Sequence, residues 1–190
     1  VLPSFLVECA NAAVLESHGN DWQFAHDKLR ENLLRRQREP EKRQRLHLTI
    51  AETLEALWMG TKAAEQKPDS GTLGYRSAIL GHHFRQAGLA DKALPYYQQA
   101  GDQSAKLFLY EEALVHYESA EESLRLLPST PALQRRQVGI LTQQVQCSVL
   151  KVPPERNLQR VTQAQQILES LRIAGLSETT DRLRMARLDY

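Results

Sequence analysis

The residues best suited to chemistry are His26 and Asp27, which follow two aromatic side chains in the stretch WQFAHDKLRENLLRR (22–36). An imidazole titrates near neutral pH, so His26 can bind a ligand, exchange a proton or hydrogen-bond a neighbour. Asp27 stands where a helical pattern begins and can cap that helix, and we favour this role over that of a catalytic acid. The open question is whether His26 meets a ligand or only a local partner.

Other reactive side chains lack the partners that catalysis or metal binding requires. His82 and His83 are adjacent, so on a helix they point about 100° apart and cannot chelate one ion together. The sequence contains no Gly-x-Ser-x-Gly elbow, no Cys–His arrangement with an orienting acid, and no zinc-like ligand spacing. Cys9 and Cys147 lie among apolar neighbours, which predicts buried, reduced and inert thiols. We therefore expect neither an enzyme nor a metal-binding protein.

The composition of the chain excludes several classes of protein. With 190 residues, 42% hydrophobic and 25% charged, it can bury one good core or two small ones. A net charge of +1 gives no overall field toward nucleic acid or anionic membranes. No apolar run approaches the roughly 20 residues of a membrane span, and no basic leader opens the chain. Because it begins without Met and ends at RMARLDY within a helical pattern, we expect a fragment of a larger cytoplasmic protein.

The residues before position 60 are predicted to contain a winged-helix remnant. Residues 4–13 are typical of a short helix capped by a serine. Residues 13–17 and 22–26 alternate like two strands, and HGND (18–21) between them predicts a tight turn and a β-hairpin. A helix, a hairpin and a further helix, in this order, form the back half of a winged helix.

Two further helices are predicted over 27–36 and from Pro40 to about Gly60. The second carries one apolar stripe, made of Leu46, Ile50, Leu54 and Leu57. Residues 27–45 contain eight Lys or Arg and four Asp or Glu, so this segment is basic. A basic segment beside a winged helix is also compatible with an alternative function, a DNA-binding adaptor that uses residues 28–45. Because opposite charges are interspersed at helical spacings and no aromatic residue lies in the run, a solvated helix face is favoured instead.

Residues 61–74 separate this first domain, 1–60, from a helical region over 75–190. They have lost the apolar stripe and contain Pro68, Gly71 and Gly74. Such a composition is typical of a linker or a loose loop.

The helical region begins with an internal repeat. ALPYYQQAGD (93–102) and ALVHYESAEE (113–122) match at Ala, Leu, Tyr and Ala with an offset of twenty residues. The small and aromatic residues of LGHHFRQAGLADKALPYYQQA stand at spacings similar to those of a tetratricopeptide helix pair. The offset of twenty residues differs from the period of about 34 in a regular tetratricopeptide array, so we expect one helix to serve two neighbours. The expected packing roles in the first pair are close approach for Gly81 and Ala93, filling for Phe84 and Tyr97, and the turn for Gly88.

More helices follow, so the predicted fold class is mainly all-α, with antiparallel helical hairpins over 75–190. LPSTP (127–131) breaks the chain, and residues 132–150 and 155–175 form another antiparallel pair, separated by two prolines. A last helix begins in 177–190, capped at Ser177 or Thr180, and we expect the region to be truncated at its C-terminus.

The order of these motifs resembles one protein family. FAHDKLRENLL, a basic stretch, RLHLTIAETLE and LGHHFRQAGLADKALPYYQQAG follow one another as in the segment after the ATPase core of bacterial STAND-class signalling proteins. Those proteins resemble AAA-type NTPases joined through a winged helix to tetratricopeptide-like repeats. The resemblance covers residues 1–127, and beyond 130 only helical-repeat character continues. It implies a regulatory segment that relays nucleotide state and binds protein or peptide partners through its repeats.

The resemblance also implies a role for His26. In that class a winged-helix histidine, in a Met-His-Asp-like motif, contacts the phosphates of the bound nucleotide, and Ala25-His26-Asp27 occupies its place with Ala for Met. An imidazole can donate a hydrogen bond to a phosphate, and the positive end of a nearby helix N-terminus also favours binding of that anion. No Gly-rich phosphate loop occurs in these 190 residues. We therefore expect no cofactor in this chain, and any ATP or ADP would be held by an upstream NTPase domain. The alternative for His26 is a local hydrogen bond.

The tyrosines of the repeat are expected mainly to fill the grooves between helices. Tyr96, Tyr110 and His83 are the residues that we expect to reach a concave face and bind a protein partner. Neither nucleic acid nor a membrane is an expected partner.

Overall fold

The computed structural model describes residues 8, 9, 11–18, 21–28, 31, 39–59, 69–148, 153–176 and 178–188. The chain forms two compact units, Val1–Arg45 and Leu46–Tyr190. The division falls within helix α3 (Pro40–Met59), which begins and ends where the sequence predicted. The predicted division of the chain into a first domain over 1–60, a linker and a helical region over 75–190 stays a prediction.

A β-hairpin is the best-defined feature of the first unit. Strands β1 (Leu15–His18) and β2 (Asp21–Phe24) pair antiparallel, with Leu15 opposite Phe24 and His18 opposite Asp21. The predicted hairpin is confirmed, although both strands lie nearer the turn than expected. Gly19 and Asn20 of that turn lie outside the described residues.

The winged helix around this hairpin stays a prediction. Its flanking helices, over 4–13 and 27–36, fall only partly within the described residues. Glu8 and Cys9 are helical, as are Asp27 and Lys28. Asp27 is thus the first residue inside the helix, whereas the prediction placed it at the N-cap position just before the helix.

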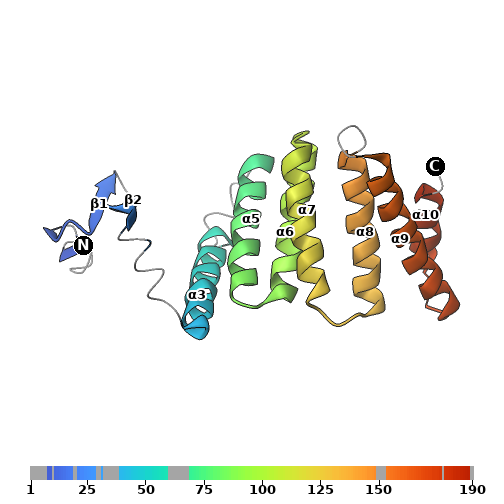
Figure 1. Cartoon of the computed structure of the whole chain (residues 1–190), viewed down its shortest axis with the longest axis horizontal. Coiled ribbons are helices and arrows are strands. Elements are labelled where there is room, and N and C mark those ends of the chain that lie inside the picture. Colours follow the sequence, from blue (N-terminus) through green and yellow to red (C-terminus); the bar gives the residue numbers. More distant parts are fainter. Residues whose placement is uncertain are drawn as a thin grey trace. The chain divides into compact units, whose positions relative to one another are not determined.

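The second unit is built from consecutive helices. From α5 onward each helix packs against the next one along the chain, so the helices stand side by side in sequence order (Figure 1). They are α5 (Ser70–Gln86), α6 (Ala90–Lys106), α7 (Tyr110–Arg125), α8 (Pro131–Ser148), α9 (Pro154–Ile173) and α10 (Thr179–Leu188). The predicted mainly all-α fold class is confirmed. None of the helices in the described residues is long and apolar enough to cross a membrane.

Helix α5 begins earlier than the sequence suggested. Asp69 caps it by accepting a hydrogen bond from the backbone N–H of Thr72 at 2.7 Å. Gly71 and Gly74, predicted as linker residues, lie in its first turns. Gly74 is buried against α6, where an added Cβ would meet the Cβ of Gln103 at 3.2 Å. The linker prediction for 61–74 was therefore wrong from Ser70 onward, because these glycines serve close helix packing.

The repeat of twenty residues corresponds to one helix and the turn that follows it. Helix α6 packs against both α5 and α7, as predicted. Gly81 on α5 faces the ring of Tyr97 on α6, and a Cβ at residue 81 would stand 3.0 Å from that ring. Gly101 on α6 faces the ring of Tyr117 on α7 in the same way. The predicted close approach at Gly81 is thus confirmed, and α6 supplies one partner to each contact.

The turns after α5 and α6 share one hydrogen-bond pattern. In each, a backbone N–H donates at 2.9 Å to the carbonyl five residues earlier, as in a Schellman motif, and the pairs are Leu89–Phe84 and Leu109–Ser104. The residue before each donor has a positive φ, +81° for Gly88 and +61° for Phe108. This conformation suits glycine and is costly for a bulky side chain. Gly88 makes the predicted turn, and Phe108 occupies the equivalent glycine position in the next repeat.

Helix α3 packs through a face that overlaps the predicted stripe only in part, because Leu54 of that stripe packs against the core. Leu46 and Leu57 of the expected stripe are exposed. Ala51 is fully buried instead, and the side chains packed around it on the same core are Leu48, Leu54 and Trp58. The prediction counted large aliphatic residues and missed Ala51, whose small side chain leaves room for dense packing.

The predicted antiparallel pair after the Pro-rich break is confirmed as α8 and α9. A buried polar cluster joins them. Arg160 of α9 donates to the hydroxyl of Ser148 on α8 at 3.3 Å and to Asn157 at 3.2 Å. Burial lowers the pKa of Arg160, and Glu118 on α7 opposes that shift.

Helix α10 is fastened to α8 by an ion pair. The Arg135 guanidinium meets Asp181 with Nε and Oδ2 3.0 Å apart. The same carboxylate accepts the backbone N–H of Glu178 at 3.0 Å, which places the cap of α10 at residue 178. The predicted cap at Thr180 was therefore wrong, because Thr180 lies inside the helix and the stabilising side chain comes from its first turn. Ser177, the other predicted cap, lies outside the described residues.

Candidate protein-binding groove

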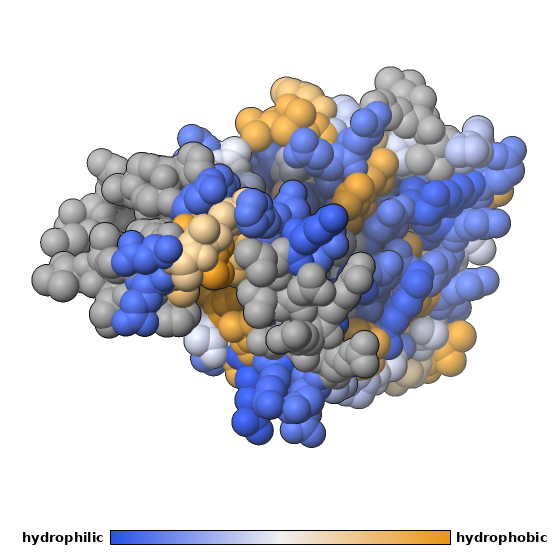
Figure 2. Space-filling view, turned by 60° about the vertical axis from the view of Figure 1, so that its left-hand side comes forward, coloured by the Kyte–Doolittle hydropathy of each residue, from blue (hydrophilic) through white to orange (hydrophobic). Residues whose placement is uncertain are grey.

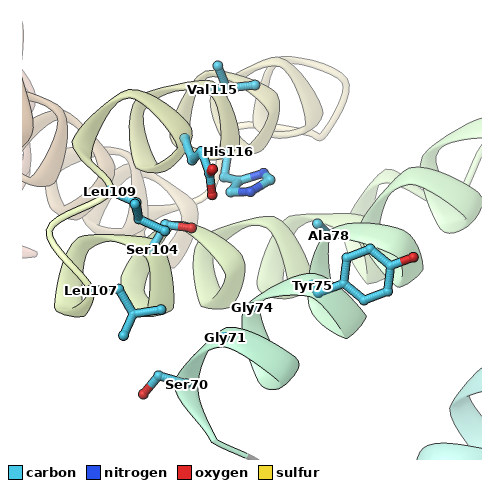
Figure 3. A pocket seen from close by; sticks show the side chains of 11 residues that line it. Ser70, Gly71, Gly74, Tyr75, Ala78, Ser104, Leu107, Leu109, Val115 and His116 are labelled. Carbon is cyan, nitrogen blue, oxygen red and sulfur yellow. The ribbon is translucent and has the colours of Figure 1, made fainter.

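A groove lies on one face of the first three repeat helices, with walls from α5 and α7 and a floor from the end of α6 (Figure 3). We call it the α5–α7 groove, and its volume is about 370 Å³. Its lining residues are Ser70, Gly71, Gly74, Tyr75, Ala78, Ser104, Leu107, Leu109, Glu112, Val115 and His116. Because two glycines and an alanine line the α5 wall, little side-chain volume narrows the groove from that side.

Apolar side chains of this groove are open to solvent. The exposed fraction is 68% for Tyr75, 59% for Val115, and 44% for both Leu107 and Leu109. These residues lie outside the stripe that forms the core. A contiguous exposed apolar patch of this kind is typical of a protein-interaction site.

The turn after α6 extends the apolar surface. We call Leu107–Tyr110 the apolar turn. Phe108 is 76% exposed, and its ring meets that of Tyr110 edge to face with centroids 6.1 Å apart. Figure 2 shows hydrophobic side chains gathered along the upper edge of the repeats, where Figure 1 places this turn. The groove and the turn thus offer one apolar surface.

A carboxylate and an imidazole line the groove, those of Glu112 and His116. Burial lowers the pKa of His116, and the nearby charge of Glu112 partly offsets this shift. His116 is therefore neutral at neutral pH, and its ring points from α7 toward α5 in Figure 3. The carboxylate of Glu112 leaves a negative charge at the wall of an otherwise apolar groove.

The three residues predicted to bind a partner do not converge on this groove. Tyr110 is the last residue of the apolar turn and is not among the residues that line the groove. Tyr96 donates a hydrogen bond to Glu55 on α3. Burial raises the pKa of the Tyr96 hydroxyl, and the hydrogen bond to Glu55 raises it further. His83 hydrogen-bonds His47 on α3, with the two Nδ1 atoms 2.9 Å apart. Tyr96 and His83 therefore hold α3 against the repeats.

The structure places His26 in the first unit, on the exposed stretch between β2 and the helical residue Asp27. Its side chain is open to solvent. Both predicted roles, phosphate contact in a larger protein and a local hydrogen bond, stay hypotheses.

Sequence reasoning missed the groove, although the repeat contained a signal for it. The turn after α5 reads AGLA (87–90), and the equivalent turn after α6 reads LFLY (107–110). Four consecutive large hydrophobic or aromatic side chains at a turn are unusual, because turns lie on the surface. Comparing the repeats position by position would have marked the second turn as a candidate binding surface.

Metal-binding and nucleophilic groups are sparse in the described part of the chain. There, no cluster of three or more His, Cys, Asp or Glu side chains is placed to hold a metal ion. Cys147 is buried as predicted, and burial raises the pKa of its thiol. Cys9 is only partly buried, contrary to the prediction, because it belongs to the small first unit rather than to the helical core.

The basic segment 28–45 falls only partly within the described residues. Lys42 forms an exposed ion pair there with Glu39, with Nζ and Oε2 2.9 Å apart. An exposed ion pair at helical spacing is typical of a helix face that lies in solvent. The DNA-binding alternative stays a hypothesis.

Comparisons with protein-family models, curated proteins and solved structures found no match to this chain. Its resemblance to STAND-class proteins therefore rests on the motifs alone, and a functional proposal has to start from the groove.

Proposed function

We propose that this chain is a non-catalytic, cytoplasmic protein-interaction segment of a larger signalling NTPase. The observation that carries the proposal is the α5–α7 groove with its exposed apolar lining. The ordered motifs that resemble STAND-class proteins supply the NTPase context. In this proposal the repeats bind a protein partner, and the first unit responds to the nucleotide state of an upstream domain.

The occupant that best fits the groove is an amphipathic helix or short peptide of a partner protein. Tyr75, Leu107 and Val115 offer it apolar contacts, which a partner with aliphatic or aromatic side chains at helical spacing would cover. Glu112 adds a requirement for charge, because a carboxylate at the wall of an apolar groove favours a nearby Lys or Arg of the ligand. The expected partner segment is therefore both apolar and basic.

A displayed library of amphipathic peptides of about 15 residues, selected against the purified chain, tests this proposal. The enriched peptides should combine two or more large apolar residues with Lys or Arg, and they should bind Val115→Glu at least about tenfold more weakly. Burying a charged carboxylate in an apolar contact costs more than the 1.4 kcal/mol that corresponds to tenfold.

A matched control comes from α9. Leu158 is 66% exposed, compared with 59% for Val115, and it is not among the residues that line the groove. Leu158→Glu should leave peptide affinity unchanged. Binding of the selected peptides to Val115→Glu as tightly as to the wild type would exclude the groove as the binding site.

The role of His26 needs a separate experiment on the parent protein. His26→Ala should weaken the response of that protein to ATP or ADP without changing peptide binding by the repeats. If the parent reading frame encodes no phosphate loop upstream, the phosphate-contact role of His26 has to be abandoned.

A further inference from the structure

A cluster of three histidines joins α3 to α5. His47 on α3 and His83 on α5 face each other with their Nδ1 atoms 2.9 Å apart and their ring centroids 5.0 Å apart. The ring of His82 lies edge-on to both, at centroid distances of 6.0 Å from His47 and 5.4 Å from His83. His47 and His83 are half-buried, whereas His82 is exposed.

The contact between the two Nδ1 atoms limits how many protons the pair can hold. In a hydrogen bond between them, one ring donates its N–H and the other accepts with a bare nitrogen. A first added proton can go to the far nitrogen of the donor ring and leave this bond intact. A second one requires N–H groups on both facing nitrogens, which breaks the bond and sets two positive rings against each other.

The surroundings of the pair oppose a second charge. Burial lowers the pKa of His83 most, and the charges of His47 and His82 lower it further. No carboxylate in the described part of the chain is among the groups that shift this pKa. Among the described residues, Arg43 precedes His47 by one turn of α3, Lys92 of α6 lies over the Phe84 ring at 5.2 Å, and Glu55 of α3 accepts a hydrogen bond from Tyr96.

Other polar contacts between α3 and the repeats are seen among the described residues. They include the Tyr96–Glu55 hydrogen bond and the Arg76 guanidinium, 5.5 Å from the ring centroid of Trp58. Its apolar contacts centre on the small side chain of Ala51. The histidine pair is thus one of the contacts that hold this helix against the repeats, so a change in the pair weakens that packing.

We propose that the His47–His83 pair is a pH-sensitive fastening, which holds α3 on α5 at neutral pH and releases it when both rings become protonated. The unfastened state takes up at least one more proton than the fastened one, so the fastening weakens as pH falls below the usual range of histidine. For each additional proton bound on opening, the opening equilibrium shifts by up to tenfold per pH unit. Because α3 also connects the two compact units along the chain, its release would be a regulatory event independent of the groove.

Hydrogen exchange of the whole chain at pH 7.5 and pH 5.0, corrected for intrinsic rates and read by mass spectrometry, tests this fastening. Peptides from residues 46–58 of α3 should lose protection by at least about tenfold at the lower pH, and those of α6 should keep theirs. In His83→Gln and His47→Gln the amide can still hydrogen-bond the remaining histidine but does not titrate, so the pH-dependent loss in α3 should disappear.

His116→Gln is the matched control, because burial also lowers the pKa of His116 but its ring lines the groove. This variant should behave as the wild type does in α3. If a glutamine variant loosens α3 at both pH values, an NMR titration of the wild-type histidine rings decides. Independent titration of His47 and His83 near their usual value would overturn the proposal. Equal protection of α3 at both pH values, or an equal loss in α6, would also overturn it.

Discussion

Gly101 and Tyr117 are packed so closely that a Cβ on residue 101 would come within 2.6 Å of the tyrosine Cε1. Tyr117 has no room to move aside, since it is buried and its hydroxyl donates to Asp102 at 2.7 Å. The contact joins α6 to α7 and repeats the one between Gly81 and Tyr97 that joins α5 to α6. Glycine at these positions therefore sets the distance between neighbouring helices.

Gly101→Ala should lower the free energy of unfolding by about 1–2 kcal/mol. The overlap with the Tyr117 ring costs about 1–3 kcal/mol, and the better helix propensity of alanine returns up to about 1 kcal/mol of that. Gly81→Ala should cost less, because its nearest contact would be 3.0 Å rather than 2.6 Å. Urea unfolding followed by circular dichroism measures both changes.

Gly139 in α8 provides the control for these substitutions, because a Cβ there would meet nothing within 4 Å. Gly139→Ala should stabilise the protein by about 0.5–1 kcal/mol through helix propensity alone. If Gly101→Ala and Gly139→Ala change stability in the same direction, Gly101 does not set the helix spacing.

The two equivalent turn positions should respond to substitution in opposite directions. Phe108→Gly should raise the free energy of unfolding by about 0.5–1 kcal/mol, because relief of the left-handed strain exceeds the gain in unfolded-state entropy. Gly88→Ala should lower it by about 1 kcal/mol for the same conformational reason. Thermal unfolding of both variants checks the signs. A loss of stability in Phe108→Gly would mean that the ring contact with Tyr110 outweighs the strain.

The helical fold was predictable because its signals are local and recur along the chain. Gly81 and Tyr97 match Gly101 and Tyr117 at a fixed offset, and both pairs pack as helix neighbours should. Gly88 likewise adopts a positive φ, a backbone conformation that a glycine at a turn already suggests in the sequence. These features depend on short-range spacing, which a single sequence displays directly.

The packing of α3 and the groove were not predictable in the same way. Leu46 and Leu57 have the residue type of a core stripe, yet they are exposed, and the face with Leu48, Ala51 and Trp58 packs on the core instead. Both faces have helical spacing, so periodicity alone does not tell which one is buried. The meeting of His47 with His83 joins residues 36 positions apart, and nothing in either local stretch indicates it. The groove wall formed by Gly74 is also a tertiary feature, because the same glycine is typical of a linker when seen in sequence.

Asp181→Asn should detach α10 from α8. The substitution removes the negative charge that Arg135 and Arg184 share, at distances of 3.0 and 3.1 Å, and should weaken docking of α10 by about 2 kcal/mol. Hydrogen exchange in residues 179–188 should rise accordingly, while α6 keeps its protection. Glu169→Gln removes an exposed partner of Arg172 and should leave exchange in α9 unchanged, which makes it the control.

The same carboxylate should make the docking of α10 sensitive to strong acid. Burial acts to raise the pKa of Asp181, but the hydrogen bond from Glu178 and the charge of Arg135 outweigh it, so the pKa lies below the usual 3.8. A lowered folded-state pKa means that the unfolded chain takes up the proton first, so the stabilisation is present above about pH 4 and disappears as pH falls through the folded-state value. Asp181→Asn should abolish this acid dependence of exchange in α10, and its persistence in the variant would assign it to another group.

Tyr117→Phe should lower the free energy of unfolding by about 1.5–3 kcal/mol, because the Asp102 carboxylate loses the hydroxyl that donates to it at 2.7 Å. The ring remains to fill the space opposite Gly101, so the effect isolates the hydrogen bond. A double-mutant cycle with Asp102→Ala measures the coupling by denaturant unfolding, and the double variant should be less destabilised than the sum of the two single ones. Additive effects would show that the hydroxyl and the carboxylate contribute separately, and would leave ring packing as the only restraint on Tyr117.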